Sequence, residues 1–193
     1  GGIPKLHELR FHQGSIWLWN RPVYDPADGG HLRIELRSLP AGPSIVDMLA
    51  NAALAIGLAK LMQPGIKELL PAIPFTYCTA NFYRAAKKGM DAELFWPSRF
   101  QSEPQYRPVA DIIQELLPQL PEQLESMGFI PSDFQPLLKV IEERLSTKQT
   151  GAQWQLNKLQ ELRKDMHKRE ALFEMFSQYR TNSAKNIPVA QWR

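Results

Sequence analysis

The sequence predicts an α+β fold, in which an N-terminal antiparallel β hairpin is followed by a mainly helical block. Two observations point to this class. Residues 9–38 are rich in aromatic and β-branched residues around one turn-forming loop, and apolar residues after position 107 recur at helical spacing. We expect a single domain over 1–193, with the hairpin at 9–38, the helical block at 44–180 and an irregular tail at 181–193.

The predicted hairpin joins strands at 9–21 and 30–38. The connecting sequence, Tyr-Asp-Pro-Ala-Asp-Gly-Gly at 24–30, is dense in turn formers. Pro40 ends the second strand because proline has no N–H to donate to a ladder. Side chains in a strand alternate between two faces. One face of the second strand is therefore apolar and the other charged, with Leu32, Ile34 and Leu36 opposite Arg33, Glu35 and Arg37.

The helical block begins with a capped, apolar helix at 44–62, in which Ser44 is the N-cap and Asp47 lies in the first turn. Residues 64–79 contain prolines and are expected to form a connector with one helical turn. A short helix at 82–88, capped by Asn81, and a loop at 91–106 follow. Amphipathic spacing then predicts helices at 107–117, 132–146 and 152–179. The core stripe expected for the last helix is Trp154, Leu159, Leu162, Met166, Phe173, Phe176 and Tyr179.

The apolar run at 44–62 has nearly the length of a membrane span. Asp47, Asn51 and Lys60 interrupt it, and much of its bulk is alanine, which carries little transfer energy. We therefore expect a core helix that is buried on most sides, and no membrane partner.

Composition limits the remaining classes. The net charge of +3 is too small to indicate a nucleic-acid partner by itself, although residues 151–193 carry eight Lys and Arg against four Asp and Glu. The basic residues of this segment are interleaved with acids, which is typical of a solvated helix face. Cys78 is the only cysteine, so the chain has no internal disulfide, and we expect a cytoplasmic location.

Familiar catalytic motifs are missing from the sequence. It has no phosphate-binding glycine loop, no His-Glu-x-x-His and no Gly-x-Ser-x-Gly. The four histidines show no metal-ligand spacing, and His167 is expected on the surface. The charged face of the second predicted strand is the remaining candidate site. A carboxylate between two arginines suits a metal-bound phosphate, whereas a solvated charge ladder on a half-buried strand is the alternative interpretation.

The hairpin text resembles a known family. Arg-Phe-His-Gln-Gly-Ser-Ile-Trp-Leu-Trp-Asn-Arg-Pro at 10–22 and His-Leu-Arg-Ile-Glu-Leu-Arg-Ser-Leu-Pro-Ala-Gly-Pro-Ser-Ile-Val-Asp at 31–47 resemble the C-terminal half of the glutamate–cysteine ligase-like carboxylate–amine ligases. Asn-Phe-Tyr-Arg-Ala-Ala at 81–86 and Thr-Gly-Ala-Gln-Trp-Gln at 150–155 are also similar to segments of that family. The resemblance is specific in the hairpin and supportive in the helices.

This resemblance implies a glutamine-synthetase-like fold, in which the hairpin belongs to a larger curved sheet. It also implies an ATP-dependent reaction, in which a glutamate-like acid becomes an acyl phosphate and an amine then forms the amide. On the resemblance, Glu35 matches a magnesium ligand and Arg37 matches the arginine that steadies the transferring phosphoryl group. Magnesium prefers carboxylate oxygens, and guanidinium groups bind phosphate.

Further residues of the hairpin are assigned less directly. Arg33 and Arg21 are candidates for contacts to the nucleotide or the substrate carboxylate, or alternatively for salt bridges on the sheet. His12 could face the same cleft or be an ordinary strand histidine. Trp17 and Trp19 are expected to pack rather than to stack on a nucleotide.

Members of this family carry an upstream half that supplies further acidic metal ligands, and this sequence contains no equivalent. Because the sequence starts at Gly1 and Gly2 without a methionine, we expect either a truncation or an internal boundary of a longer chain. One carboxylate rarely holds magnesium alone. We therefore expect that the chain by itself does not catalyse the full reaction and that its partner is the missing N-terminal half. An exposed strand edge would also allow self-association into a homo-oligomer.

The competing hypothesis is non-catalytic. In it the chain is a helical interaction module that uses the basic helix at 152–180 to bind a partner. A third and weaker possibility is nucleic-acid binding through the same helix, whose basic residues are Arg163, Lys164, Lys168 and Arg169.

Overall fold

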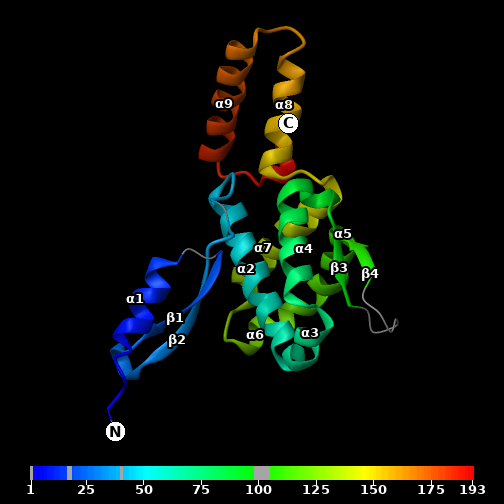
Figure 1. Ribbon diagram of the computed structural model, residues 1–193. Coiled ribbons are helices and arrows are strands. Elements are labelled where there is room, and N and C mark those ends of the chain that lie inside the picture. The colour runs from blue at the N-terminus through cyan, green and yellow to red at the C-terminus, as the bar shows by residue number, and fades with distance from the viewer. Residues whose placement is uncertain (1, 17–18, 40, 98–104) are drawn as a thin grey trace. The chain divides into compact units, whose positions relative to one another are not determined.

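The structure is a computed structural model that describes residues 2–16, 19–39, 41–97 and 105–193. An antiparallel β hairpin precedes a helical block that contains a second small sheet, so the predicted α+β class is confirmed (Figure 1). Backbone contacts divide the chain into two compact units, Gly1–Ala41 and Gly42–Arg193. This division does not test the expectation of a single domain over 1–193, which stays a prediction.

The N-terminal unit is a helix beside a two-stranded hairpin. Its elements are α1 (His7–Ser15), β1 (Asn20–Asp25), the 3-10 turn η1 (Ala27–Gly29) and β2 (His31–Leu36). The strands pair over six residues, from Asn20 opposite Leu36 to Asp25 opposite His31. The connecting loop contains Asp28, Gly29 and Gly30 at φ values of 50°, 91° and 77°. Glycine adopts this left-handed region without steric cost, which explains the Gly-Gly pair.

The predicted strand at 9–21 is wrong over most of its length. Residues His7–Ser15 form α1, and the strand begins only at Asn20. β2 offers six residues for pairing, and these are used by Asn20–Asp25. Among the described residues of this unit no further strand is available, and the backbone groups of His7–Ser15 are satisfied within a helix instead. Trp17, Pro40 and part of the predicted loop at 91–106 lie outside the described residues.

The C-terminal unit is mainly helical. Its helices are α2 (Ile45–Met62), α3 (Ile66–Ala72), α4 (Phe75–Lys88), α5 (Val109–Leu116), α6 (Leu120–Ser126), α7 (Pro131–Thr147), α8 (Gly151–Leu162) and α9 (Lys168–Ala184). Short 3-10 turns are η2 (Gln63–Gly65), η3 (Gly89–Asp91), η4 (Leu117–Gln119) and η5 (Val189–Gln191). A second antiparallel pair consists of β3 (Glu93–Trp96) and β4 (Gln105–Pro108).

The main core lies where α2 packs against α6 and α7. Gly57 lets α2 approach α6 closely, because a Cβ at this position would stand 3.3 Å from the Leu120 side chain. The stripes predicted for 107–117 and 132–146 face the protein interior, as expected. Their fully buried members are Ile112, Leu117, Phe134, Leu138, Ile141 and Leu145.

Two connecting regions are more ordered than predicted. The connector at 64–79 contains α3 and the start of α4, and the helix expected at 82–88 begins at Phe75. Asn81 therefore lies inside α4 and caps nothing. Its amide instead pairs with the backbone of Phe95, donating to the carbonyl at 2.8 Å and accepting from the N–H at 2.7 Å. This pairing ties β3 to α4, in a region predicted to be loop.

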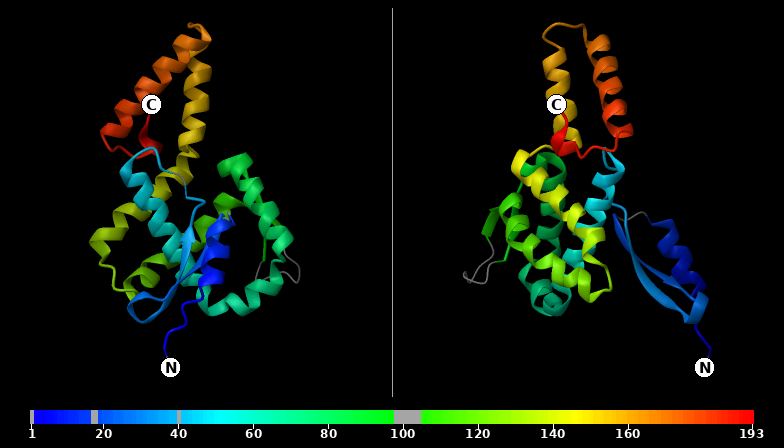
Figure 2. Two further views of the ribbon diagram at one scale, coloured as in Figure 1. Left: turned by 60° about the vertical axis from the view of Figure 1, so that its left-hand side comes forward. Right: turned by 180° about the vertical axis from the view of Figure 1, so that it is seen from behind.

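The single helix predicted over 152–179 is two helices. α8 ends at Leu162, α9 begins at Lys168, and the two pack beside each other (Figure 2). The reversal places Met166 in the connection between the helices and changes which side of the second helix faces inward. Met166, Phe173 and Phe176 are therefore exposed rather than buried. The tail predicted as irregular from 181 contains the last turn of α9 and then η5.

α2 confirms one prediction and corrects another. Ser44 is its N-cap and accepts a hydrogen bond from the Asp47 N–H at 3.2 Å. The helix is not buried on most sides, however, since Ile45, Met48, Leu49 and Ile56 are exposed. By length and composition alone, the stretch Ile45–Ala72 could cross a membrane. Its 18-residue apolar window has a mean hydropathy of 1.7, and 22% of that window is buried in this structure.

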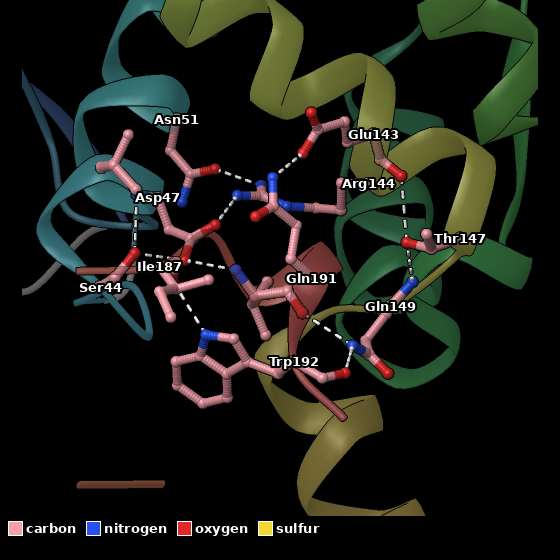
Figure 3. A network of polar contacts seen from close by, with 12 residues as sticks. Ser44, Asp47, Asn51, Glu143, Arg144, Thr147, Gln149, Ile187, Gln191 and Trp192 are labelled. Atoms are coloured by element: carbon pink, nitrogen blue, oxygen red, sulfur yellow. Dashed lines mark hydrogen bonds and ion pairs between the residues drawn. The ribbon is translucent and has the colours of Figure 1, made fainter. Parts of the chain in front are cut away.

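A buried polar network holds the C-terminal tail against α2 and α7 (Figure 3). The Asp47 carboxylate, which is 0% exposed, accepts from Ser44 Oγ at 2.6 Å, Arg144 Nη2 at 2.8 Å and the Val189 N–H at 3.0 Å. Gln149 Nε2 donates to the carbonyls of Val189 and Trp192 at 2.7 and 2.9 Å. The Asp47 contacts with Arg144 and Val189 join segments 97 and 142 residues apart in sequence.

Candidate anion-binding site

Three of the four predicted site residues meet on one face of the β1–β2 hairpin. The register places Arg21 directly opposite Glu35, and Arg37 follows the end of β2 with its N–H bonded to the Trp19 carbonyl at 2.8 Å. Arg21 Nε donates to Glu35 Oε2 at 2.5 Å. Arg37 donates from Nε to Oε1 at 3.0 Å and from Nη2 to Oε2 at 3.3 Å. The Glu35 carboxylate therefore lies between two guanidinium groups.

These contacts lower the pKa of Glu35 below the ordinary value for a glutamate. The hydrogen bonds from Arg37 are the largest cause, and those from Arg21 come second. Arg21 makes the shorter contact, but Arg37 contacts both carboxylate oxygens. Hydrogen bonds to the charged form of a carboxylate favour that form. Glu35 is therefore ionised at neutral pH.

Arg33 lies on the same strand but is held separately. Its Nη1 is 3.4 Å from Asp25 Oδ2 and 2.8 Å from His31 Nε2. The pKa of Asp25 is lowered, first by the hydrogen bond from the Ala27 N–H and then by Arg33. Both Arg21 and Arg33 thus form salt bridges on the sheet, which is the alternative that the sequence left open. The structure does not bring Arg33 onto Glu35.

A pocket of about 450 Å³ opens beside these residues, between α1 and the hairpin. This volume lies in the range of small-molecule sites. Its lining is basic, with one acidic residue, and consists of His7, Arg10, Phe11, Gln13, Gly14, Arg21, Val23, Tyr24, Asp25 and Arg33. Arg21 also donates from Nη1 to the Gln13 carbonyl at 2.8 Å, which ties the hairpin to α1.

Arg10 and His7 are the charge-bearing groups of this pocket that remain available. Among the described residues neither has an ion-pair partner, whereas Arg21 and Arg33 are each paired with a carboxylate. A guanidinium beside an imidazole can bind phosphate or carboxylate oxygens. The pocket therefore suits an anion.

The predicted residues divide between the pocket and its edge. Arg21 and Arg33 line the pocket, whereas Glu35 and Arg37 do not line it and reach it only through Arg21. His12, expected on a strand, lies on α1 and is exposed, and it does not line the pocket. Trp19 is exposed.

His7, Arg10 and Phe11 were missed as site residues because their segment was predicted as strand or left unassigned. Together with Gly14 they recur at i, i+3, i+4 and i+7, which places them on one face of a helix. This helical spacing could have revealed α1 from the sequence. The strand prediction relied instead on the aromatic and β-branched content of 9–21.

The solvent exposure of the two hairpin faces differs from that of a strand half-buried through its apolar face. The apolar face is open to solvent, with Leu32 76% exposed and Ile34 62% exposed. The charged side, by contrast, carries the half-buried Glu35 and Arg37 and forms the pocket with α1. The buried apolar face expected in the charge-ladder alternative is therefore absent from the described residues of this unit, whereas Arg33 and Glu35 keep the solvent exposure which that alternative expects.

The donor set here does not by itself fit a magnesium ion. Magnesium prefers six oxygen ligands in octahedral geometry, and both oxygens of Glu35 already accept hydrogen bonds from arginines. Over residues 2–16, 19–39, 41–97 and 105–193, no group of three or more His, Cys, Asp or Glu side chains is arranged to hold a metal.

The two supporting segments of the resemblance have structural roles in the C-terminal unit. Asn81 fixes β3 to α4, and the Arg84 guanidinium lies 4.4 Å from the centre of the Tyr106 ring. Thr150 is the N-cap of α8 and accepts from the Gln153 N–H at 3.2 Å. Trp154 is buried against Val189 and Trp192. None of these residues lines the pocket.

Comparisons with models of protein families, with curated proteins and with solved structures found no match for this chain.

Proposed function

We propose that this chain is the C-terminal part of an ATP-dependent carboxylate–amine ligase of the glutamate–cysteine ligase-like type. The observation that carries the proposal is the arrangement around Glu35. Two arginines hold its carboxylate, and a basic pocket of about 450 Å³ begins at one of them. Such a ligase must hold the phosphates of ATP beside a second acidic substrate, and a cluster of guanidinium groups supplies the donors for both.

In this proposal Arg37 steadies the transferring phosphoryl group. It uses Nε and Nη2 on Glu35, which leaves further N–H donors of the same guanidinium for phosphate oxygens. Because Glu35 fixes the orientation of both arginines, their charge is positioned before a ligand arrives. Arg33 and Arg21 contact the nucleotide or the substrate carboxylate from the pocket side.

Magnesium enters this proposal as an ion shared with residues from elsewhere. Glu35 would supply one ligand through Oε1, which accepts a single hydrogen bond and keeps a second lone pair, and the missing N-terminal half would supply the others. The exposed apolar face of β2 supports contact with a further part of the longer protein, since soluble proteins rarely leave contiguous apolar surface open to solvent. The outer edges of the two-stranded β1–β2 sheet could accept further strands of a larger sheet, and they would also permit a homo-oligomer.

The test uses the longer protein that carries this chain. We expect Glu35→Gln to abolish magnesium-dependent ADP release in the presence of glutamate and an amine. Glu115→Gln is the matched control, because Glu115 is also a glutamate paired with an arginine, at 2.7 Å, but lies in the C-terminal unit. Full turnover in Glu35→Gln would rule out the ligase assignment.

A second function is supported by a different observation. Phe173 and Phe176 on α9 are exposed, as are the basic residues between α8 and α9. These features support the non-catalytic alternative, a helical module that binds a partner through 152–180. Partner binding would then survive loss of Glu35 and Arg37, and would fail on charge reversal at Lys164 and Lys168.

A further inference from the structure

The outer face of α9 carries an apolar patch that no described element of its unit covers. Phe173 is 74% exposed and Phe176 is 55% exposed, with Leu172 beside them. Ala171, Met175 and Tyr179 lie on the inner side, where Ala171 is fully buried and the other two pack near Trp154. The exposed phenylalanines are thus not part of the α8–α9 contact, which Figure 2 shows from two sides.

Arginines bound this patch at both ends. Arg169, Phe173, Phe176 and Arg180 follow each other at spacings of four, three and four residues, so they share one face of the helix. Arg169 and Arg180 are about 16 Å apart along the axis, from the rise of 1.5 Å per residue. Both are exposed, and within the described part of the chain neither forms an ion pair.

The acids of α9 lie away from this face and have other contacts. Glu170 accepts a hydrogen bond from the His167 N–H at 3.3 Å, and Glu174 accepts one from Gln178 at 2.8 Å. The apolar patch therefore has a cation at each end and no acid between them. A surface complementary to this patch would carry apolar side chains between two acids whose separation matches that of Arg169 and Arg180.

We propose that the outer face of α9 binds an amphipathic helix whose apolar stripe is bounded by acidic residues about eleven positions apart. This inference deepens the second function above and is independent of the ligase proposal. The added helix would complete a three-helix arrangement with α8 and α9. Its apolar stripe would cover the two phenylalanines, and its acids would pair with Arg169 and Arg180.

Charge argues against the other two occupants of this face. A second copy of α9 would bring arginine against arginine, in either a parallel or an antiparallel arrangement. On a lipid bilayer the phenylalanines would enter the acyl chains, and the arginines, one turn away on the same face, would have to extend back to the headgroups, whereas the acids of a docked helix meet them directly.

The test is a titration of the full chain with two labelled helical peptides of about 20 residues, followed by fluorescence anisotropy. One peptide carries leucines between two glutamates eleven positions apart, and its twin carries lysines in place of the glutamates. We expect binding of the glutamate peptide alone. Phe173→Ala with Phe176→Ala should weaken it about tenfold or more, and Arg169→Glu with Arg180→Glu should transfer the preference to the lysine peptide.

Leu156→Ala is the matched control, since Leu156 is an equally exposed apolar residue on α8. It should leave the affinity unchanged. Equal binding of both peptides, or binding of neither, would overturn the proposal. So would dimerisation in sedimentation that Phe173→Ala abolishes, or Phe173-dependent binding to phosphatidylserine vesicles. Peptide binding that depends on Lys164 and Lys168 but not on Arg169 and Arg180 would retain the interaction module and reject this face.

Discussion

At the scale of single residues, Glu35 and Asp47 show two uses of a carboxylate held by arginine. Glu35 is 40% exposed at its side chain and lies between two guanidinium groups next to an open pocket. Asp47 is 0% exposed, and its contacts with Ser44, Arg144 and the Val189 N–H occupy both oxygens. The first arrangement leaves room for a ligand, whereas the second stabilises the fold.

Glu35 gives a prediction about pH. Its pKa in the folded chain is below the ordinary value of 4.5, so its contacts stabilise the N-terminal unit above about pH 4.5, and this contribution is lost as the pH falls through the lowered pKa. In a carbon-detected NMR titration, Arg37→Ala should return the pKa of Glu35 toward 4.5 more than Arg21→Ala does. Arg10→Ala is the control and should leave it unchanged. An unshifted pKa in the unmodified chain would contradict the described contacts.

Asp47 gives a prediction about stability. Removal of one partner from a buried ion pair leaves the other charge without compensation, at a cost of about 3–5 kcal/mol. Asp47→Ala should therefore lower the free energy of unfolding by about that amount in urea denaturation. Asp133→Ala, at an exposed aspartate in the first turn of α7, should cost less than about 1 kcal/mol. Equal effects of the two substitutions would contradict a structural role for Asp47.

At the scale of elements, sequence patterns were reliable where a helix has one clear apolar stripe. α5 and α7 agree with their predicted stripes, and the cap at Ser44 is confirmed. The predictions failed where contacts with a distant segment of the chain decide the local structure. The segment of α1 has the composition of a strand, but no described strand of its unit is free to pair with it. The sequence of α8 and α9 predicts one helix because the residues between them are polar and include no proline or glycine to mark the reversal.

The candidate site, too, was predictable where it depends on local sequence and not where it depends on tertiary contacts. The alternation in β2 placed Arg33, Glu35 and Arg37 on one face, and Arg21 was already a candidate from the sequence. The register with β1 shows that Arg21 lies opposite Glu35. The pocket was not predictable, because half of its lining comes from α1. The Asp47 network also depends on contacts with the C-terminal tail, which local sequence patterns do not reveal.

The base of the α8–α9 pair depends on the tail. The Trp192 ring packs edge-on against Trp154 and Tyr179, at centroid distances of 5.2 and 5.1 Å, and its Nε1 donates to the Ile187 carbonyl at 2.8 Å. Trp192→Ala should cost about 3–5 kcal/mol in stability and speed hydrogen exchange of the α9 amides. Phe173→Ala, on the exposed side of the same helix, should change neither. Slow exchange in Trp192→Ala would show that α9 is held by other contacts.

At the scale of the whole molecule, the two compact units carry different features. The N-terminal unit holds the arginine-rich pocket, and the C-terminal unit holds the hydrophobic core, the buried Asp47 network and the exposed face of α9. In the ligase proposal, the first unit supplies one wall of a shared active site. The cytoplasmic location, the missing N-terminal half and the bound nucleotide stay predictions of the ligase proposal.

In the ligase proposal, the basic pocket of the N-terminal unit binds the phosphates of a nucleotide. The most direct measurement is an NMR titration of the arginine side-chain N–H groups of the full chain with ATP, with and without magnesium. We expect shifts at the pocket arginines Arg10, Arg21 and Arg33 and, with magnesium, at Arg37 beside the pocket. Arg10→Ala should weaken the shifts at Arg21 and Arg33, and Arg180→Ala should not. Shifts spread evenly over all arginines, or none at these three, would contradict it.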